Sequence, residues 1–133
     1  MKIRIRGNSI RFRLTRGDVD TFGKTGKVQE TINFGPAAGG QLNYTLQRTD
    51  VSDLTTSYSE GHILIEVPHD VATVWTNDQM VIGMEHLANE DTEHPLRIVV
   101  EKDFHCVQIR KDEDDSDTFP NPKGKAEPDA SLS

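Results

Sequence analysis

The chain opens with two short segments that alternate charged and apolar residues, the pattern of β-strands with one buried face. Lys2–Arg6 and Ser9–Leu14 both alternate in this way, and Gly7-Asn8 between them suits a tight turn. These segments predict a β-hairpin. Because neighbouring side chains of a strand point to opposite faces, the apolar residues share one face and the basic residues the other, wet face. The apolar set contains Ile3, Ile5, Ile10, Phe12 and Leu14; the basic set contains Lys2, Arg4, Arg6, Arg11 and Arg13.

A short helix and two further strands are predicted after this hairpin. Thr15 suits an N-cap, and Asp18 three residues later makes a variant of the capping box, while Gly23 and Gly26 suit the helix end. Alternating apolar residues then flank a glycine-rich turn at residues 35–40, which predicts a pair of strands. Those apolar residues are Val28, Ile32 and Phe34 before the turn and Leu42, Tyr44 and Leu46 after it.

The same order of elements recurs in the second half of the chain. Residues 54–59 and 62–67 predict a hairpin across Glu60-Gly61, residues 68–76 a helix, and residues 80–87 and 96–101 two strands. Shifts of 52 to 54 positions superpose the apolar residues of the two halves, for example Ile10 on Ile63 and Val28 on Val81. We therefore predict a duplicated unit with pseudo-twofold symmetry, in halves of about residues 1–48 and 54–102. The alternative is a meander of strands in which such pairings arise by chance.

These patterns predict one α+β domain of mostly antiparallel strands over residues 1–109. The composition changes at residue 110, where an acidic run is followed by Pro120-Asn121-Pro122 and few apolar residues. Such a composition predicts a mostly disordered tail over residues 110–133. Its acidic segment contains Asp112, Glu113, Asp114, Asp115 and Asp117.

Charge is distributed unevenly along the 133 residues. The net charge is −7, but residues 1–27 carry +6, residues 28–109 carry −10 and residues 110–133 carry −3.

Neither a membrane-spanning run nor a signal peptide is recognisable, and the single Cys106 excludes an intramolecular disulfide and zinc sites built on several cysteines. We therefore expect a cytoplasmic protein.

No pattern of catalytic or metal-binding residues emerges from the sequence. Gly23-Lys24-Thr25 ends like a phosphate-binding loop, but the spacing from Gly17 is wrong and the intervening residues favour a helix. His105 and Cys106 are neighbours on a predicted strand and point to opposite faces, and the acidic run departs from a calcium loop. We expect no cofactor and no metal, and the sequence leans against an enzyme; a metal site assembled only in three dimensions stays open.

The basic face of the first hairpin is the strongest functional signal. Five cations on one face repel one another unless acids, phosphates or open water lie against them. The protein's own acids, an acidic partner protein or the phosphates of nucleic acid would each satisfy this need. Our first functional hypothesis is a non-catalytic interaction module in which these cations anchor a partner and the acidic segment acts as an intramolecular competitor.

Two segments of the chain resemble a family of small, uncharacterised bacterial proteins. They are residues 2–15 and residues 100–106, the latter followed by the acidic run and Pro120-Asn121-Pro122. The family is one of unknown function, so the resemblance implies no activity and no site residues.

A fainter resemblance concerns His62–Val71 followed by Val81, which is similar to the strand, Pro-led helix and strand of AbrB-type transition-state regulators. It implies a cradle-loop-like barrel, built here by duplication within one chain. Thr76-Asn77-Asp78-Gln79 replaces the glycine-aspartate turn of that family, and the net charge of −7 is wrong for a DNA-binding protein. An AbrB-like nucleic-acid-binding regulator is therefore the second hypothesis, and a small-ligand or metal-binding protein is the third.

Overall fold

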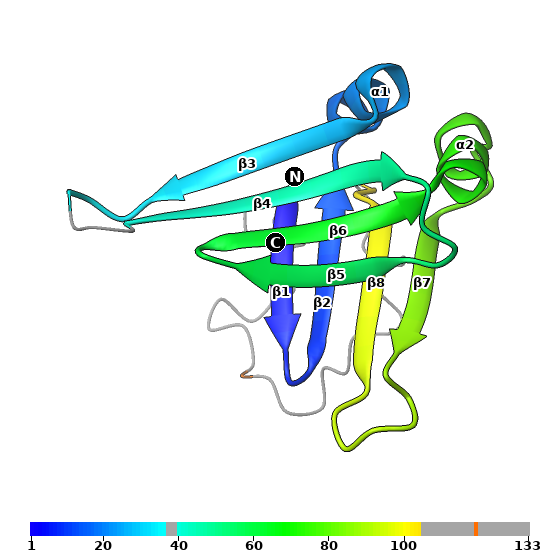
Figure 1. Ribbon diagram of the computed structural model, residues 1–133. Coiled ribbons are helices and arrows are strands. Elements are labelled where there is room, and N and C mark those ends of the chain that lie inside the picture. Colours follow the sequence, from blue (N-terminus) through cyan, green and yellow to red (C-terminus); the bar gives the residue numbers. More distant parts are fainter. Residues whose placement is uncertain (37–39, 105–118, 120–133) are drawn as a thin grey trace. The chain divides into compact units, whose positions relative to one another are not determined.

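The computed structural model shows eight strands and two helices among the residues that it describes (Figure 1). The structure describes residues 1–36, 40–104 and 119, and Met1–Asp103 form one compact unit. The elements are β1 (Lys2–Arg6), β2 (Ser9–Leu14), α1 (Arg16–Thr25), β3 (Lys27–Asn33), β4 (Gln41–Thr49), β5 (Thr55–Ser59), β6 (His62–Pro68), α2 (His69–Asn77), β7 (Gly83–Ala88) and β8 (Leu96–Lys102). Except for Phe119, the predicted tail lies outside the described residues.

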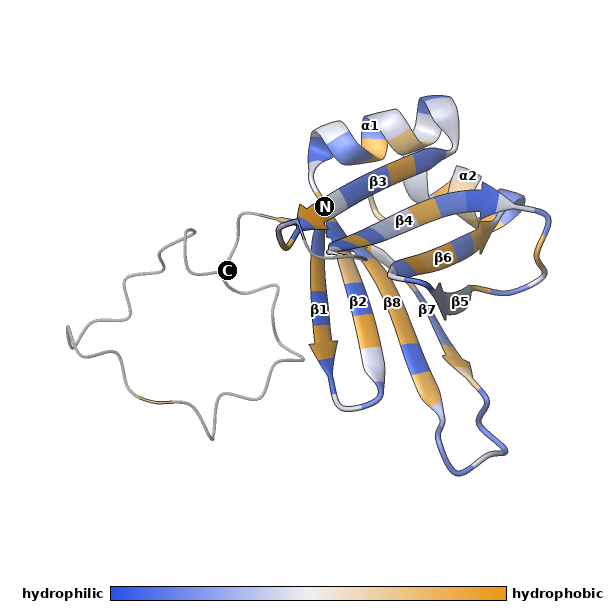
Figure 2. Cartoon of the chain, turned by 60° about the vertical axis from the view of Figure 1, so that its left-hand side comes forward, coloured by the Kyte–Doolittle hydropathy of each residue, from blue (hydrophilic) through white to orange (hydrophobic). Residues whose placement is uncertain are grey.

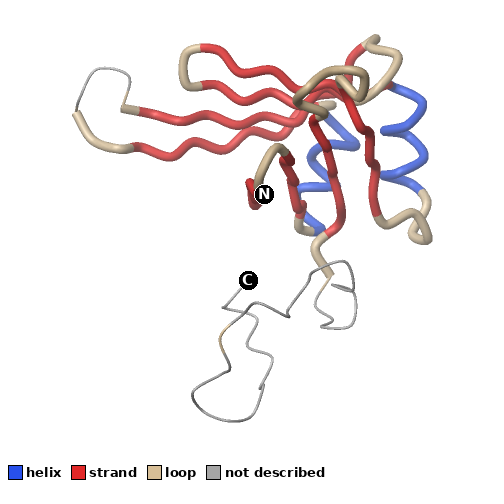
Figure 3. The backbone as a smooth tube through the Cα atoms, turned by 90° about the horizontal axis from the view of Figure 1, so that it is seen from below, coloured by secondary structure: helices blue, strands red, loops and turns tan. Residues whose placement is uncertain are grey.

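The strands form two separate four-stranded sheets, in the orders β1-β2-β8-β7 and β3-β4-β6-β5. Each sheet has antiparallel outer pairs around one parallel central pair, β2 with β8 and β4 with β6. The predicted α+β class with mostly antiparallel strands is therefore confirmed. Figure 3 shows the two sheets as distinct layers, rather than the closed cradle-loop-like barrel that the AbrB resemblance implied.

Each sheet combines one hairpin from each half of the chain. The order of two strands, helix and two strands occurs twice. The parallel pairs also correspond: Ser9 lies opposite Arg97 in the first sheet, and its counterpart His62 lies opposite Asn43 in the second. A duplicated unit would produce such pairings, and the duplication and its pseudo-twofold axis stay predictions.

One superposition of the halves is wrong. β7 begins at Gly83 instead of residue 80, because a turn in which the Val81 amide donates to the Asp78 carbonyl lengthens the connection from α2. Val28 pairs with Leu46, and Met84 pairs with Val100 at the corresponding place. The buried counterpart of Val28 is therefore Met84 and not Val81.

The core lies between the inner faces of the two sheets and under the helices. Alternating apolar and polar residues along β1 and β2 give these strands the striped appearance of Figure 2. Phe12 of the first sheet and Leu46 of the second are fully buried, and Phe22 of α1 meets Trp75 of α2 edge to face at 5.9 Å between ring centres. Burial of this apolar surface is the main force that holds the sheets and helices together.

The first helix has the ends that its sequence predicts. The Thr15 hydroxyl accepts a hydrogen bond from the Asp18 amide, and the Asp18 carboxylate accepts one from the Thr15 amide, so the capping box is confirmed. Gly26 follows α1 in the left-handed conformation, with φ of 79°, which glycine adopts without strain. Residues 23–25 are therefore the last turn of a helix and not a phosphate-binding loop.

Candidate functional site

The basic residues of the first hairpin lie on the face of the first sheet that points away from the core. Strand pairing arranges this face in three rows, and residues of one row point to the same side. The rows across β1, β2 and β8 are Lys2, Arg13 and Glu101; Arg4, Arg11 and Val99; and Arg6, Ser9 and Arg97. The parallel pairing of β2 with β8 therefore brings a carboxylate of the second half into the basic set.

Acids of the protein itself pair with cations of the predicted set. The Glu101 Oε1 atom lies 2.7 Å from Arg13 Nε and 3.3 Å from Arg11 Nη1, and Lys2 Nζ lies 3.1 Å from an Asp103 carboxylate oxygen. Arg13 is only 8% exposed. The expectation of a wet face is therefore wrong for Arg13. Its guanidinium group is largely buried, and the ion pair with Glu101 compensates its charge there.

The remaining part of this face is exposed at the outer edge of the sheet. Arg4 and Arg6 lie on β1, which is an edge strand, and both are exposed. Arg97 makes an ion pair with Glu85 of β7. Among the described residues, this face holds six cations, and three carboxylates lie on it or pair with it. We call this set the basic face: Lys2, Arg4, Arg6, Arg11, Arg13 and Arg97 with Glu85, Glu101 and Asp103.

A buried ion cluster holds the start of β1. The Met1 ammonium lies 2.8 Å from an Asp18 oxygen and 2.7 Å from a Glu30 oxygen, and the Tyr44 hydroxyl donates to the Met1 carbonyl at 3.1 Å. Sequence reasoning missed this cluster, because its members come from the residue before β1 and from α1, β3 and β4, and no spacing along the chain connects them.

The cluster shifts the titration of its members. Burial alone would lower the pKa of the Met1 amino group, but hydrogen bonds to Asp18 and Glu30 and the charges of these carboxylates raise the pKa above 8.0. Burial alone would raise the pKa of Asp18, but hydrogen bonds from the ammonium and from Thr15 lower it below 3.8. Burial, followed by the nearby charges of Glu30 and Asp18, raises the pKa of Tyr44. The cluster therefore stabilises the charged forms of the Met1 amino group and the Asp18 carboxyl group.

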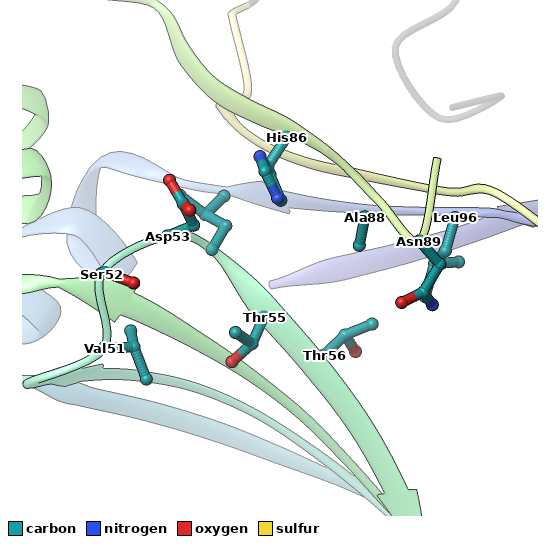
Figure 4. Close-up of a pocket in the computed structure, with 10 residues that line it drawn as sticks. Val51, Ser52, Asp53, Thr55, Thr56, His86, Ala88, Asn89 and Leu96 are labelled. Carbon is teal, nitrogen blue, oxygen red and sulfur yellow. The ribbon is translucent and has the colours of Figure 1, made fainter. Parts of the chain in front are cut away.

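A cavity of about 580 Å³ lies between β5 of one sheet and β7 and β8 of the other (Figure 4). Thr55 and Thr56 line one side, and His86, Ala88 and Leu96 line the other, while Asp53 lies at one end. The sequence gives no sign of this cavity, since the approach of β5 to β7 is a tertiary feature without a local signal.

No reactive dyad or metal cluster is evident within the described part of the chain. The Thr45 hydroxyl lies 2.7 Å from His62 Nε2 and 3.1 Å from Gln29 Oε1, but Thr45 is fully buried and cannot reach a substrate. No three His, Cys, Asp or Glu side chains of the described residues gather as a metal site. His105, Cys106 and the acidic segment lie outside the described residues.

The helices of the described residues are too short or too polar to cross a membrane. The cytoplasmic location stays a prediction.

Comparison with known proteins gives a family and no function. A search of curated proteins and a search of solved structures both find no match. The model of the family of unknown function DUF7009 matches residues 1–123, which include both sheets, both helices and the acidic segment. The predicted resemblance to a family of unknown function is thereby confirmed, and no comparison bears on the AbrB resemblance. Because the match covers most of the chain, the chain belongs to the DUF7009 family.

Proposed function

We propose that the protein is a non-catalytic interaction module that binds an acidic partner segment through its basic face. The supporting observation is the excess of cations there, with Arg4 directly opposite Arg11 on neighbouring strands. Like charges in directly opposed positions destabilise a sheet. An acidic partner would relieve this repulsion, and complementary charge would also speed its association.

The cations have different roles in this proposal. Arg11 and Arg13 share the Glu101 carboxylate, which holds their guanidinium groups in fixed positions. Arg4 and Arg6 are exposed on the edge strand, where an incoming carboxylate can approach them from solvent. Arg4 and Arg6 are therefore the residues that a partner meets first, and the inner pair supports them.

The acidic segment is the proposed intramolecular competitor for the same face. It carries five carboxylates within six residues, and the family match extends past it to residue 123. A tethered segment competes at a high effective concentration, so a few weak contacts are enough to reduce binding of a free partner. Its position stays a prediction, because it lies outside the described residues.

An AbrB-like nucleic-acid-binding regulator is the alternative, since phosphates would meet the same arginines. Such binding weakens steeply with salt because bound counterions are released from the nucleic acid. The net charge of −7 opposes it by repelling a polyanion over the rest of the surface.

The test is a titration of the full chain with a polyglutamate peptide and with duplex DNA over a range of salt concentrations. Arg4→Gln with Arg6→Gln removes two cations of the basic face. Lys24→Gln with Lys27→Gln is the matched control, because these exposed lysines lie outside the basic face and their loss changes net charge equally. We expect about tenfold weaker peptide binding in the arginine variant and little change in the lysine variant.

Neutralising the acidic segment tests the competition separately. Replacing its five acids with Asn or Gln should strengthen peptide binding several-fold if the segment covers the basic face. Equal affinities would contradict the competition and leave the basic face intact as a proposal. Salt-steep DNA binding that is lost in the arginine variant would favour the alternative, and absence of binding to either probe would contradict both.

A further inference from the structure

The free edge of β5 differs from the charged edge of the first sheet. β5 is the last strand of the sheet β3-β4-β6-β5, and its sequence Thr-Thr-Ser-Tyr-Ser contains no charged residue. Edge strands usually carry charges or proline that discourage pairing with another chain, as Lys2, Arg4 and Arg6 do on β1. β5 has no such protection, so its edge is open to an added strand.

The hairpin geometry identifies the backbone groups that face outward from β5. Glu60 and Gly61 form a two-residue turn, with φ of 47° and 78°, so the flanking Ser59 and His62 make a hydrogen-bonded pair. Hydrogen-bonded and non-hydrogen-bonded pairs alternate along an antiparallel ladder. The amide and carbonyl groups of Thr56 and Tyr58 therefore point away from β6, toward the free edge.

The cavity beneath this edge offers a floor for side chains of an added strand. Leu54, Ala88 and Leu96 supply apolar surface, and Figure 4 shows Thr56 facing Ala88 and Leu96 across the space. The Tyr58 side chain is 69% exposed on the same strand. An extended segment paired with β5 would direct alternate side chains onto this floor.

The charges around the cavity determine which kind of segment can bind there. Asp53 lines this cavity and an adjoining one of about 400 Å³, and Asp70 and Glu85 also line the second. His86 is shared by both, and among the described residues no Lys or Arg lines either cavity. A segment with a basic side chain next to its apolar residues is therefore complementary, whereas an acidic segment is repelled.

We propose that the β5 edge and the cavity beneath it bind an extended segment of a partner protein, which adds a fifth strand to the second sheet. The segment carries apolar residues at alternate positions and a lysine or arginine that meets Asp53. This site goes beyond the proposed function, since it lies on the other sheet and selects the opposite charge.

The test uses the full chain and a synthetic peptide of alternating valine and threonine with a lysine at each end. The matched probe carries glutamate in place of lysine. We expect saturable binding of the lysine peptide, with amide exchange of Thr56 and Tyr58 slowed about tenfold at saturation, because only these β5 amides gain new acceptors. The exchange of Thr55, Ser57 and Ser59 should hardly change, since their amides already donate to β6.

Two variants in the same loop test the charge. Asp53→Asn should weaken lysine-peptide binding about fivefold, whereas Asp50→Asn should leave it nearly unchanged, because Asp50 is exposed and does not line the cavity. No binding at millimolar peptide, equal binding of both peptides, or protection of β7 instead of β5 would overturn the proposal. Protection of Thr56 and Tyr58 in the absence of peptide would also overturn it, because another segment would already occupy the edge. Failure of the basic face to bind polyglutamate would leave this result unaffected.

Discussion

The hairpins β1-β2 and β5-β6 have the same backbone plan and opposite surface chemistry. Both pair five residues on each strand across a two-residue turn, and each lies beside a parallel strand from the other half of the chain. The inward residues of β2 and β6 are apolar in the same places, with Phe12 and Ile65 both fully buried. Their outward rows differ, because Arg4 stands where the second hairpin has Ser57.

This difference separates what the fold needs from what it tolerates. The buried row and the turn are required for the sheet, and they occur in both hairpins. The row of cations occurs in one hairpin only, since the outward positions of β5-β6 carry Glu66 and no lysine or arginine, so strand pairing does not need it. Glu101 is an exception among the outward residues, because the fold needs its carboxylate to compensate the charge of the buried Arg13.

The largest effect should come from removing the acid that pairs with Arg13. Glu101→Gln leaves a buried guanidinium without its counter-charge, and we expect the free energy of unfolding to fall by about 3 kcal/mol in a urea titration. Glu85→Gln is the control, because its ion pair with Arg97 is half exposed and contributes less than about 1 kcal/mol. Equal losses of unfolding free energy in the two variants would mean that Glu101 contributes no more to stability than an exposed acid such as Glu85.

The turns of the two hairpins should tolerate a methyl group differently. Gly61→Ala places a Cβ 2.8 Å from the Gln41 carbonyl oxygen at a φ of 78°, whereas Gly7→Ala meets no atom within 4 Å at a φ of 55°. We expect losses of about 2 kcal/mol for Gly61→Ala and about 1 kcal/mol for Gly7→Ala, which is the cost of the left-handed conformation alone. Thermal unfolding of both variants measures the difference, and a larger loss at Gly7 would contradict the packing described for Gly61.

The ion cluster at Met1, at the start of the first hairpin, predicts a pH dependence of stability. Asp18→Asn should lower stability by about 1 kcal/mol near neutral pH. The Asp18 contribution is fully present above its unfolded pKa near 3.8 and is lost as the pH falls through its lower folded value. The amino-group contribution is present below pH 8.0 and is lost as the pH rises through the raised pKa. Urea titrations at several pH values should show both losses in the wild type and a flatter curve in the variant.

The smallest effect should come from exchanging the outward residues of the two hairpins. Arg4→Ser and Ser57→Lys should each change stability by less than about 0.5 kcal/mol, because neither position faces the core. A larger loss in chemical denaturation would show that the outward rows are structural. The polyglutamate affinity should fall in Arg4→Ser although its stability is maintained.

The local elements of this fold follow from the sequence, and the contacts between them do not. Alternation along residues 2–14 and the Thr15 cap are local signals, and they predict the first hairpin and helix correctly. The parallel pairing of β2 with β8 joins residues nearly 90 positions apart, and no spacing indicates it. The same pairing buries Arg13 beside Glu101, which is why the five basic residues share the outward face as predicted while the exposure expected for Arg13 is wrong. The cavity beside β5 was missed for the same reason.

The most direct test of the central claim is to map polyglutamate binding on the full chain by amide chemical shifts. The account predicts saturable, salt-sensitive shifts at Arg4, Arg6 and Ser9, with little change at Ser57 and His62 in the second hairpin. Shifts of equal size in both hairpins, or none at saturating peptide, would contradict it, because the basic outward row of β1-β2 would then have no binding role that the outward row of β5-β6 lacks.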